Sequence, residues 1–316
     1  MNILVTGASG FVGAKLLERL DSSLVKVLGR GLPVNFPESH FYQLDIGKST
    51  DYAEALCDVD TVVHLAARVH VMKDTAAMPL EEYREVNTHG TINLAQQAVR
   101  AGVKRFIFVS SIKVLGESTR LNSPFTHDDD HSPEDDYGLS KSEAEIELFK
   151  LSEDTGMEIV VIRPTLVYGP GVKANFASLL NLVSKGIPLP FGCITDNRRS
   201  LVSVTNLVDL IITCIDHPKA ANQTFLVSDD NDVSTSDMVA LMAKALDKSQ
   251  WQPPVPKWCY RLMGKLLSKQ AMVDRLLGSL QVDINHTKET LDWTPPQSLE
   301  EGIKEAALAF YNSQRK

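Results

Sequence analysis

A tyrosine and a lysine stand four residues apart in the segment Tyr137-Gly138-Leu139-Ser140-Lys141. On a helix this spacing places the two side chains on one face. A phenol with an ordinary pKa of about 10 is a poor base at neutral pH, and a neighbouring ammonium favours the phenolate. The spacing therefore predicts that Tyr137 moves a proton on and off an alcohol oxygen and that Lys141 tunes the pKa of Tyr137.

A hydroxyl group that could hold the same oxygen follows a short apolar run. Ser110 and Ser111 come directly after the expected strand Arg105–Val109. Ligands of α/β proteins bind outside the carboxyl ends of the strands. Ser111 is therefore expected at that edge, in contact with the reacting oxygen.

A glycine-rich segment, TGASGFVG at 6–13, follows the first apolar run and opens a helical pattern. Its first glycine allows a tight turn, the second lets the backbone approach a pyrophosphate, and the third lets helix and strand pack closely. The helix N-terminus then faces the phosphates. The motif predicts a dinucleotide site that includes Gly7, Ser9, Gly10, Phe11, Val12 and Gly13.

The end of the second strand distinguishes NADP from NAD, because an acid there binds the ribose 2′-hydroxyl and an arginine accommodates a 2′-phosphate. The strand ends Leu28-Gly29-Arg30-Gly31, without an acid. Arg30 therefore favours NADP(H), whereas NAD(H) remains the alternative if Arg30 stacks on adenine or points to solvent. Asp45 could accept a hydrogen bond from the adenine amino group or could form a turn.

Short β-branched runs at 2–6, 25–28, 61–66, 105–109 and 158–163 alternate with helical patterns at 10–20, 80–101 and 135–155. The runs are apolar on both faces, as in a parallel sheet that helices cover on both sides. The pattern predicts a doubly wound, Rossmann-type α/β sheet.

The pattern changes after residue 170, where helical segments alternate with proline-rich turns. We expect residues 1–170 to form the dinucleotide-binding domain with the catalytic residues. Residues 171–316 are expected to form a smaller, mostly helical domain for the substrate. Runs at 201–204 and 225–228 could be strands that return to the first sheet, so that 201–230 would belong with the first domain.

Composition excludes several classes of protein. With 43% hydrophobic and 23% charged residues the chain has the composition of a folded protein, and its net charge of −8 disfavours nucleic acid as a partner. Anionic ligands must then be held by helix N-termini or local arginines. The four cysteines lack zinc spacing, no apolar run is long enough to span a bilayer, and the start has no signal-peptide pattern, so a cytoplasmic location is expected.

Together these motifs resemble the extended short-chain dehydrogenases/reductases of the NAD-dependent epimerase/dehydratase family, which act on nucleotide sugars. The resemblance rests on TGASGFVG (6–13), VVHLAA (62–67), VNTHGTINL (86–94), VSSIKVLG (109–116), YGLSK (137–141) and RPTLVYGP (163–170). It implies a catalytic triad of Ser111, Tyr137 and Lys141, and a homodimer formed through the helices at 80–101 and 135–155. The further cofactor contacts it implies are Asp45, Ile46, Leu65, Ala66, Ala67, Asn87, Val109, Tyr137, Lys141 and Pro164, with Asn87 alternatively ordering its own helix.

For the substrate, a UDP-sugar, the same resemblance implies contacts from Asn175, Arg199 and Arg275. Arginine suits this task because its fork matches diphosphate oxygens. Ser111 and Lys113 are further expected substrate contacts, although at Lys113 the epimerase pattern would have a small residue or Thr. Arg199 could alternatively form a salt bridge at the rim, and Lys113 could be a solvated lysine at a strand end.

The resemblance leaves the reaction open. Sugar 4,6-dehydratases carry an Asp-Glu pair directly after the catalytic hydroxyl residue, where this chain has Ile112 and Lys113. Without that acid and base, dehydration is excluded. Arg30 favours reduction of a UDP-4-keto-6-deoxy-N-acetylhexosamine by NADPH for surface-polysaccharide synthesis. The alternative is a UDP-hexose or N-acetylhexosamine 4-epimerase, and a non-catalytic NADP-binding sensor is a third hypothesis, disfavoured by the retained triad.

Two weaker patterns remain. The run His127-Asp128-Asp129-Asp130-His131 is more typical of a solvated acidic loop than of a metal site, and no metal is predicted. Basic residues recur every four positions at Lys257, Arg261, Lys265 and Lys269. They indicate a solvated helix face or, alternatively, peripheral contact with anionic lipid.

Overall fold

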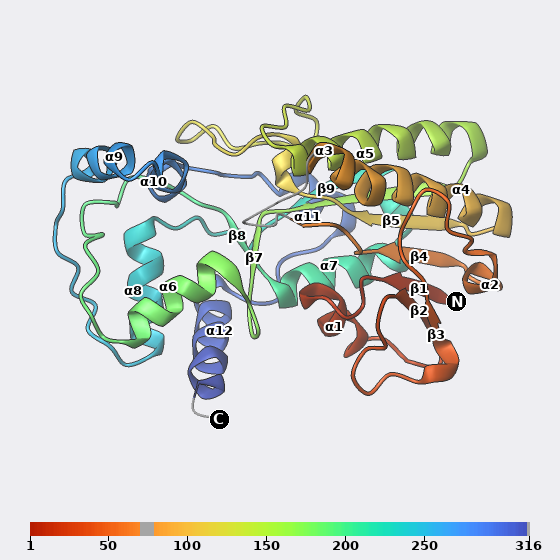
Figure 1. The fold of residues 1–316 in the computed structure, drawn as a ribbon, viewed down its shortest axis with the longest axis horizontal. Helices are drawn as coiled ribbons and strands as arrows, with labels where there is room; N and C mark the ends of the chain where they lie inside the picture. Colours follow the sequence, from red (N-terminus) through yellow and green to blue (C-terminus); the bar gives the residue numbers. More distant parts are fainter. Residues whose placement is uncertain (70–78, 315–316) are drawn as a thin grey trace.

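A seven-stranded parallel sheet runs through the molecule (Figure 1). The computed structural model describes residues 1–69 and 79–314. The strand order is β3 (Phe41–Gln43), β2 (Val25–Gly29), β1 (Ile3–Thr6), β4 (Thr61–His64), β5 (Arg105–Val109), β6 (Glu158–Pro164) and β9 (Gln223–Val227). Every neighbouring pair is parallel. The predicted doubly wound α/β fold is confirmed.

Helices cover both faces of this sheet (Figure 1). On one side lie α1 (Phe11–Leu17) and α7 (Val204–Asp216), and on the other α2 (Ala53–Leu56), α4 (Thr91–Ala101) and α5 (Asp136–Thr155). Strand side chains alternate between two buried apolar clusters: Val5 and Ile107 belong to one cluster, and Leu4 and Phe106 to the other. Burial on both faces explains why the strands are continuous apolar runs.

The strand order reverses between β1 and β4, which lie side by side at the centre of the sheet. In open α/β sheets the crevice outside the carboxyl ends of such strands holds the ligand. The segments that follow β1, β4, β5 and β6 all emerge at this edge, because the strands are parallel. They carry most of the predicted site residues.

The helix predicted at 80–101 is interrupted. It consists of α3 (Pro79–Tyr83), a wide π-helical stretch (Arg84–Gly90) and α4. Gly90 packs against the loop after β3, where an added Cβ would lie 2.7 Å from Ile46 Cγ2. π-helical turns of this kind frequently occur at functional sites.

A second unit extends from the sheet. It contains β7 (Leu166–Tyr168), β8 (Leu201–Ser203), α6 (Ala174–Ser184), α8 (Thr235–Ala245) and α12 (Leu299–Ser313), with its own apolar cluster. The strand expected at 201–204 forms as β8, but it pairs with β7 in a separate two-stranded sheet, so the prediction that it returns to the first sheet is wrong. Gln223–Val227 does join the first sheet, where it occupies the edge beside β6.

The remaining elements are short. They are α9 (Lys257–Leu266), α10 (Gln270–Leu277), α11 (Asn285–Leu291) and the 3-10 turns η1 (Glu38–His40), η3 (Ile112–Val114) and η4 (Pro218–Ala220). Within the described ranges, no helix combines the length and apolar character needed to cross a bilayer. The four cysteines form no disulfide with one another.

Candidate active site

The turn between β1 and α1 has room only for glycine. Gly7 has a positive φ of 70°, and an added Cβ would lie 2.6 Å from the backbone nitrogen of Ala66. A Cβ on Gly13 would lie 2.3 Å from the carbonyl oxygen of Gly7. The chain after β1 therefore runs directly against the chain after β4, which leaves an open backbone surface at the sheet edge.

The start of α1 has no side-chain cap at Gly10. Backbone N–H groups in the first turn are therefore available to an anionic ligand. Contacts among β1, β4 and the chain after β4 hold this turn in place. Ala66 N donates to Thr6 Oγ1 at 3.2 Å, and Thr6 Oγ1 lies 2.7 Å from His64 Nδ1. These features fit the pyrophosphate of a dinucleotide.

Lys141 is buried where α5 crosses the end of β5. Its Nζ donates to the carbonyl oxygen of Val109 at 3.0 Å and lies 4.3 Å from the centre of the Phe108 ring. Burial lowers the pKa of Lys141 to about 7, although the charge of Glu145 opposes this shift. The ammonium is thus held at the carboxyl edge of the sheet, with donors left over for a ligand.

Tyr137 lies in the first turn of α5, and its ring meets the edge of Tyr83 at 6.2 Å between centroids. Burial raises the pKa of Tyr137, and the nearby Asp135 and Tyr83 raise it further. The sequence predicts the opposite direction, because the spacing to Lys141 suggests a stabilised phenolate. In the structure, burial and the Asp135 carboxylate set the direction of the shift, and the role of Lys141 toward Tyr137 stays a prediction.

Ser111 caps η3 directly after β5, and its Oγ accepts from the backbone N–H of Lys113 at 3.3 Å. The start of α5 packs on this turn so closely that a Cβ on Gly138 would lie 2.6 Å from the carbonyl oxygen of Lys113. Asp135 accepts from Gly138 N at 2.7 Å and also forms an ion pair with the Lys113 ammonium. The turn that carries Ser111 and the turn that carries Tyr137 are thereby fixed to each other.

A buried ionic network that sequence reasoning missed lies behind these residues. Glu145, fully buried one turn beyond Lys141, pairs with Arg163 Nη2 at 2.6 Å and accepts from Ser110 Oγ. Burial would raise the pKa of Glu145, but its partners His131 and Arg163 hold that pKa below the usual value. A charged residue in the apolar strand β6 was the sequence signal that could have indicated this network.

Asn87 ties the chain after β4 to α5. Its side chain bonds both the N–H of Arg68, at 2.8 Å, and the carbonyl oxygen of Arg68, at 3.0 Å, and it donates to Ser140 Oγ at 3.0 Å. The wide π-helical stretch carries Asn87. Its side chain therefore orders the segment that follows Leu65, Ala66 and Ala67.

Arg30 and Asp45 lie at the far end of the same edge, after β2 and β3. Their side chains are 88% and 76% exposed, and Arg30 Nε lies 3.8 Å from Asp45 Oδ1. From the sequence, Arg30 and Asp45 were given separate roles, whereas in the structure their side chains lie together. A carboxylate beside Arg30 offsets part of the charge that would attract a 2′-phosphate. The other cofactor-side residues, Ile46, Val109 and Pro164, lie in the loop after β3 and at the ends of β5 and β6.

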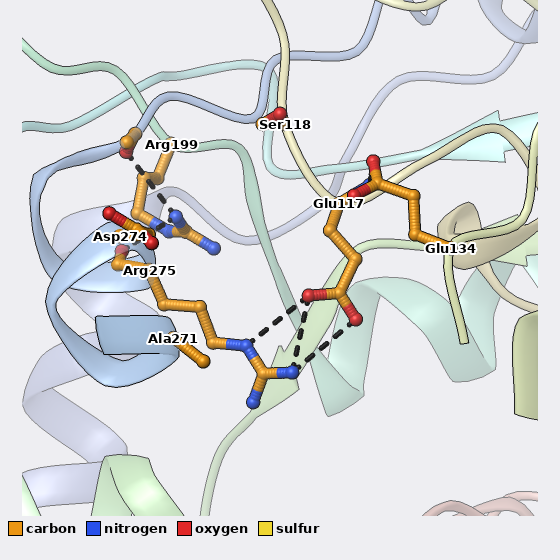
Figure 2. Close-up of a pocket in the computed structure, with 8 residues that line it drawn as sticks. Glu117, Ser118, Glu134, Arg199, Ala271, Asp274 and Arg275 are labelled. Atoms are coloured by element: carbon orange, nitrogen blue, oxygen red, sulfur yellow. Dashed lines mark hydrogen bonds and ion pairs between the residues drawn. The ribbon is translucent and has the colours of Figure 1, made fainter. Parts of the chain in front are cut away.

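Arg199 and Arg275 line one cavity of about 230 Å³, together with Glu117, Ser118, Glu134, Ala271, Asp274 and Gly278 (Figure 2). Arg199 Nη1 donates to the carbonyl oxygens of Arg275 and Gly278 at 3.0 and 3.3 Å. Burial and the nearby Arg275 charge lower the pKa of Arg199. Two guanidinium groups in one cavity are suited to an anionic ligand.

Glu117 connects this cavity to the catalytic edge. It accepts from Arg275 Nη2 at 3.2 Å and from Lys113 Nζ at 2.6 Å. Lys113 is therefore fixed by ion pairs with Glu117 and Asp135, and it is not a solvated lysine. Asn175 lies in the first turn of α6 and is exposed, without a hydrogen bond to the cavity residues.

The histidines of the acidic run separate in the structure. His127 stacks on His286 at 3.6 Å between ring centroids, whereas His131 bonds Ser142 Oγ at 2.8 Å and Arg163 at 2.6 Å. Among the described residues, no cluster of three or more His, Cys, Asp or Glu side chains could hold a metal ion.

The fold is that of a Rossmann-type α/β protein. We call the backbone surface at Gly7, Gly10 and Gly13 the dinucleotide cradle, after the ligand that it would hold. Residues 3–228 match the model of the "NAD dependent epimerase/dehydratase family". A UDP-glucose 4-epimerase of Vibrio cholerae is 62% identical over 313 residues, which cover 98% of this chain and 95% of that protein. The chain therefore belongs to the NAD dependent epimerase/dehydratase family, and it is an enzyme of the extended short-chain dehydrogenase/reductase type.

Solved structures share the fold over the whole chain. A UDP-glucuronic acid 4-epimerase from Bacillus cereus, solved with NAD, has a TM-score of 0.78 at 20% identity and covers 99% of each chain. A UDP-glucose 4-epimerase from Thermotoga maritima, solved with UDP-glucose, has a TM-score of 0.78 at 24% identity and covers 99% of this chain and 100% of its own. The arrangement of the large sheet and the second unit is thus a shared architecture.

Proposed function

We propose that this chain interconverts the C4 epimers of a UDP-hexose, such as UDP-glucose and UDP-galactose. The observation that carries the proposal is a proton-transfer pair, Tyr137 and Lys141, beside the dinucleotide cradle in a chain 62% identical to a UDP-glucose 4-epimerase. Ile112 is buried and Lys113 is ion-paired, so neither position offers the acid pair that dehydration needs. The similarity favours the epimerase alternative over the reduction that Arg30 suggested.

NAD is the cofactor that this proposal requires. The family description names NAD, a structural neighbour was solved with NAD, and the Asp45 carboxylate beside Arg30 disfavours a 2′-phosphate. The open backbone at Gly7 and Gly10 and the uncapped start of α1 would hold its pyrophosphate. Bound there, NAD would supply the hydride acceptor and donor that chemistry at C4 needs.

The residues of the site would manage the proton that accompanies this hydride. Tyr137 would take the C4 hydroxyl proton as the sugar is oxidised and give it back to the same oxygen as the sugar is reduced on its other face. Ser111 would donate a hydrogen bond to that oxygen. Lys141, already bonded to Val109, would use its remaining protons to hold ribose hydroxyls and to stabilise the Tyr137 phenolate.

The cavity of Arg199 and Arg275 would hold the diphosphate of the substrate. Arg199 projects into the cavity, and Arg275 would exchange its exposed ion pair with Glu117 for phosphate oxygens. Exposed pairs of this kind are worth about 0–1 kcal/mol, so the exchange costs little. Arg199→Ala is expected to raise KM for UDP-glucose more than it lowers kcat.

The test is to incubate the protein with UDP-glucose, without a reduced cofactor, and to measure UDP-galactose by chromatography. The proposal expects conversion to an equilibrium mixture by the unmodified chain and none by Tyr137→Phe that still binds NAD. A parallel sample contains the UDP-4-keto-6-deoxy-N-acetylhexosamine and NADPH. Stoichiometric oxidation of NADPH there, with no epimerisation in the first sample, would support reduction and refute the proposal.

A further inference from the structure

Exposed apolar side chains are concentrated on two short helices, α9 and α10, which pack against each other at one end of the long axis (Figure 1). Trp258 is 65% exposed and Leu266 is 74% exposed. Single exposed apolar residues are ordinary, but a contiguous group marks an interaction site. We call this group the α9–α10 surface; its apolar members are Trp258, Leu262, Met263, Leu266, Leu267 and Met272, all half-exposed or more.

Basic side chains border the apolar ones. Trp258, Leu262 and Leu266 recur every four residues along α9 and form one stripe. Lys257, Arg261 and Lys265 recur with the same spacing one position earlier, so they form a second stripe beside the first. Lys269 continues the basic stripe into the turn before α10.

Most of the basic side chains on the α9–α10 surface form no ion pair within the described part of the chain. Lys257 pairs with Asp196, but in the described part of the chain Arg261, Lys265 and Lys269 have no ion pair. The chain as a whole carries a net charge of −8. A local basic stripe on an acidic protein therefore gives this surface a sign opposite to that of the rest of the molecule.

We propose that the α9–α10 surface docks on an anionic phospholipid bilayer. A helix with an apolar stripe and a Lys/Arg-rich flank lies in the plane of the membrane interface, where tryptophan is also favoured. A second copy of the chain fits less well, because a two-fold contact between identical surfaces would bring their basic stripes together. A protein partner fits less well too, since lysine is depleted from protein interfaces.

Docking would also orient the catalytic unit. α10 supplies Ala271, Asp274 and Arg275 to the cavity that contains Arg199. The proposed diphosphate site would therefore lie next to the lipid headgroups. The docking itself does not depend on the proposed epimerase activity, because it rests only on the α9–α10 surface.

Vesicle co-sedimentation of the full chain tests the proposal. We expect binding to vesicles of phosphatidylcholine mixed with phosphatidylglycerol and much weaker binding to vesicles of phosphatidylcholine alone. Binding to the mixed vesicles should decline as salt is added. The triple variant R261Q/K265Q/K269Q should lower the partition coefficient on the order of a hundredfold, since each basic residue near such a surface contributes about a fivefold factor. K185Q/K219Q/K304Q removes the same charge from exposed lysines elsewhere and should bind like the unmodified chain.

A second variant tests the apolar stripe. W258S/L262S/L266S should also abolish vesicle binding, while circular dichroism and UDP-glucose turnover in the absence of vesicles stay unchanged. Equal sedimentation with both kinds of vesicle, or none with either, would overturn the proposal. So would light scattering that shows a dimer in the unmodified chain and a monomer in W258S/L262S/L266S, because a second copy would then cover the surface.

Discussion

Tyr137, the proposed proton-transfer residue, is held in a form that is hard to ionise. Burial, Asp135 and Tyr83 all raise the pKa of its phenol, although Lys141 lies one helical turn away. In the proposed reaction, the bound cofactor and substrate would therefore supply part of the stabilisation of the phenolate. Charges around the phenol should control the pH range in which the enzyme works.

Asp135→Asn tests this control. Removing the carboxylate takes away a charge that raises the pKa of Tyr137, and it frees the Lys113 ammonium, which favours the phenolate. The rise of kcat/KM with pH should therefore shift to lower pH. Asp136→Asn is the control, because Asp136 is the next residue and is exposed, and it should leave the pH profile unchanged. A profile that is unchanged or shifted to higher pH in Asp135→Asn would show that this carboxylate does not control the ionisation of Tyr137.

Glu145→Gln tests the buried network behind the site. The substitution leaves the Arg163 guanidinium buried without its counter-charge, and the loss of one partner of such a pair costs about 3–5 kcal/mol. Urea unfolding should show this loss. Glu147→Gln, at a half-exposed position two residues later, should change the free energy of unfolding by less than about 0.5 kcal/mol. Equal effects of the two variants would mean that the network is not stabilising.

At the start of α1, Gly13 lies close against the carbonyl oxygen of Gly7 in the proposed dinucleotide cradle. Gly13→Ala would place a Cβ 2.3 Å from the Gly7 carbonyl oxygen. The clash can be relieved only by a shift of the Gly7 backbone, which is part of the cradle. NAD affinity, measured by calorimetry, should fall more than about tenfold, a change of about 1.4 kcal/mol. Gly31→Ala, where an added Cβ meets nothing within 4 Å, is the matched control. Unchanged affinity in Gly13→Ala would exclude the proposed cradle.

His64 connects β1, β4 and α4 through bonds to Thr6 Oγ1 at 2.7 Å and Thr91 Oγ1 at 2.9 Å. Burial lowers the pKa of His64 to about 3, so the folded protein keeps the imidazole neutral while the unfolded chain protonates it below its usual pKa of about 6.5. The unfolded state then binds more protons, and stability present above that pH is lost as the pH falls.

This linkage has a measurable size. Between pH 7 and 4 the free energy of unfolding should fall by about 3 kcal/mol on account of His64 alone. Denaturant titrations at the two pH values measure the difference. His64→Gln should flatten the dependence, and an equally steep dependence in that variant would assign the acid loss to other groups.

Sequence reasoning predicted the elements whose burial is regular. The strands of the large sheet could be predicted because their side chains are apolar on both faces. The turn at 6–13 could be predicted because its glycine spacing is typical of a strand–turn–helix that binds a pyrophosphate. The π-helical stretch was not predicted, and it ends at Gly90, which packs against Ile46, 44 residues earlier in the chain. The partner of β8 and the Arg30–Asp45 pair were likewise missed, because local sequence does not specify which segments meet.

On the scale of the whole molecule, charge is distributed in separate regions. The net charge of −8 describes most of the surface, while guanidinium groups line the cavity of Arg199 and Arg275 and a basic stripe borders the α9–α10 surface. The homodimer that the resemblance implies stays a prediction. It would use α4 and α5, on the side of the sheet away from α1 and α7, and would leave the α9–α10 surface free.

In the proposed reaction one hydride leaves C4 and returns to the same carbon on its other face. UDP-glucose labelled with deuterium at C4 tests it directly, by mass spectrometry of the UDP-galactose formed without added NADH or NADPH. We expect a product that keeps the deuterium at C4, with no consumption of cofactor. Loss of the deuterium from C4, or a product that appears only as a reduced cofactor is consumed, would contradict it.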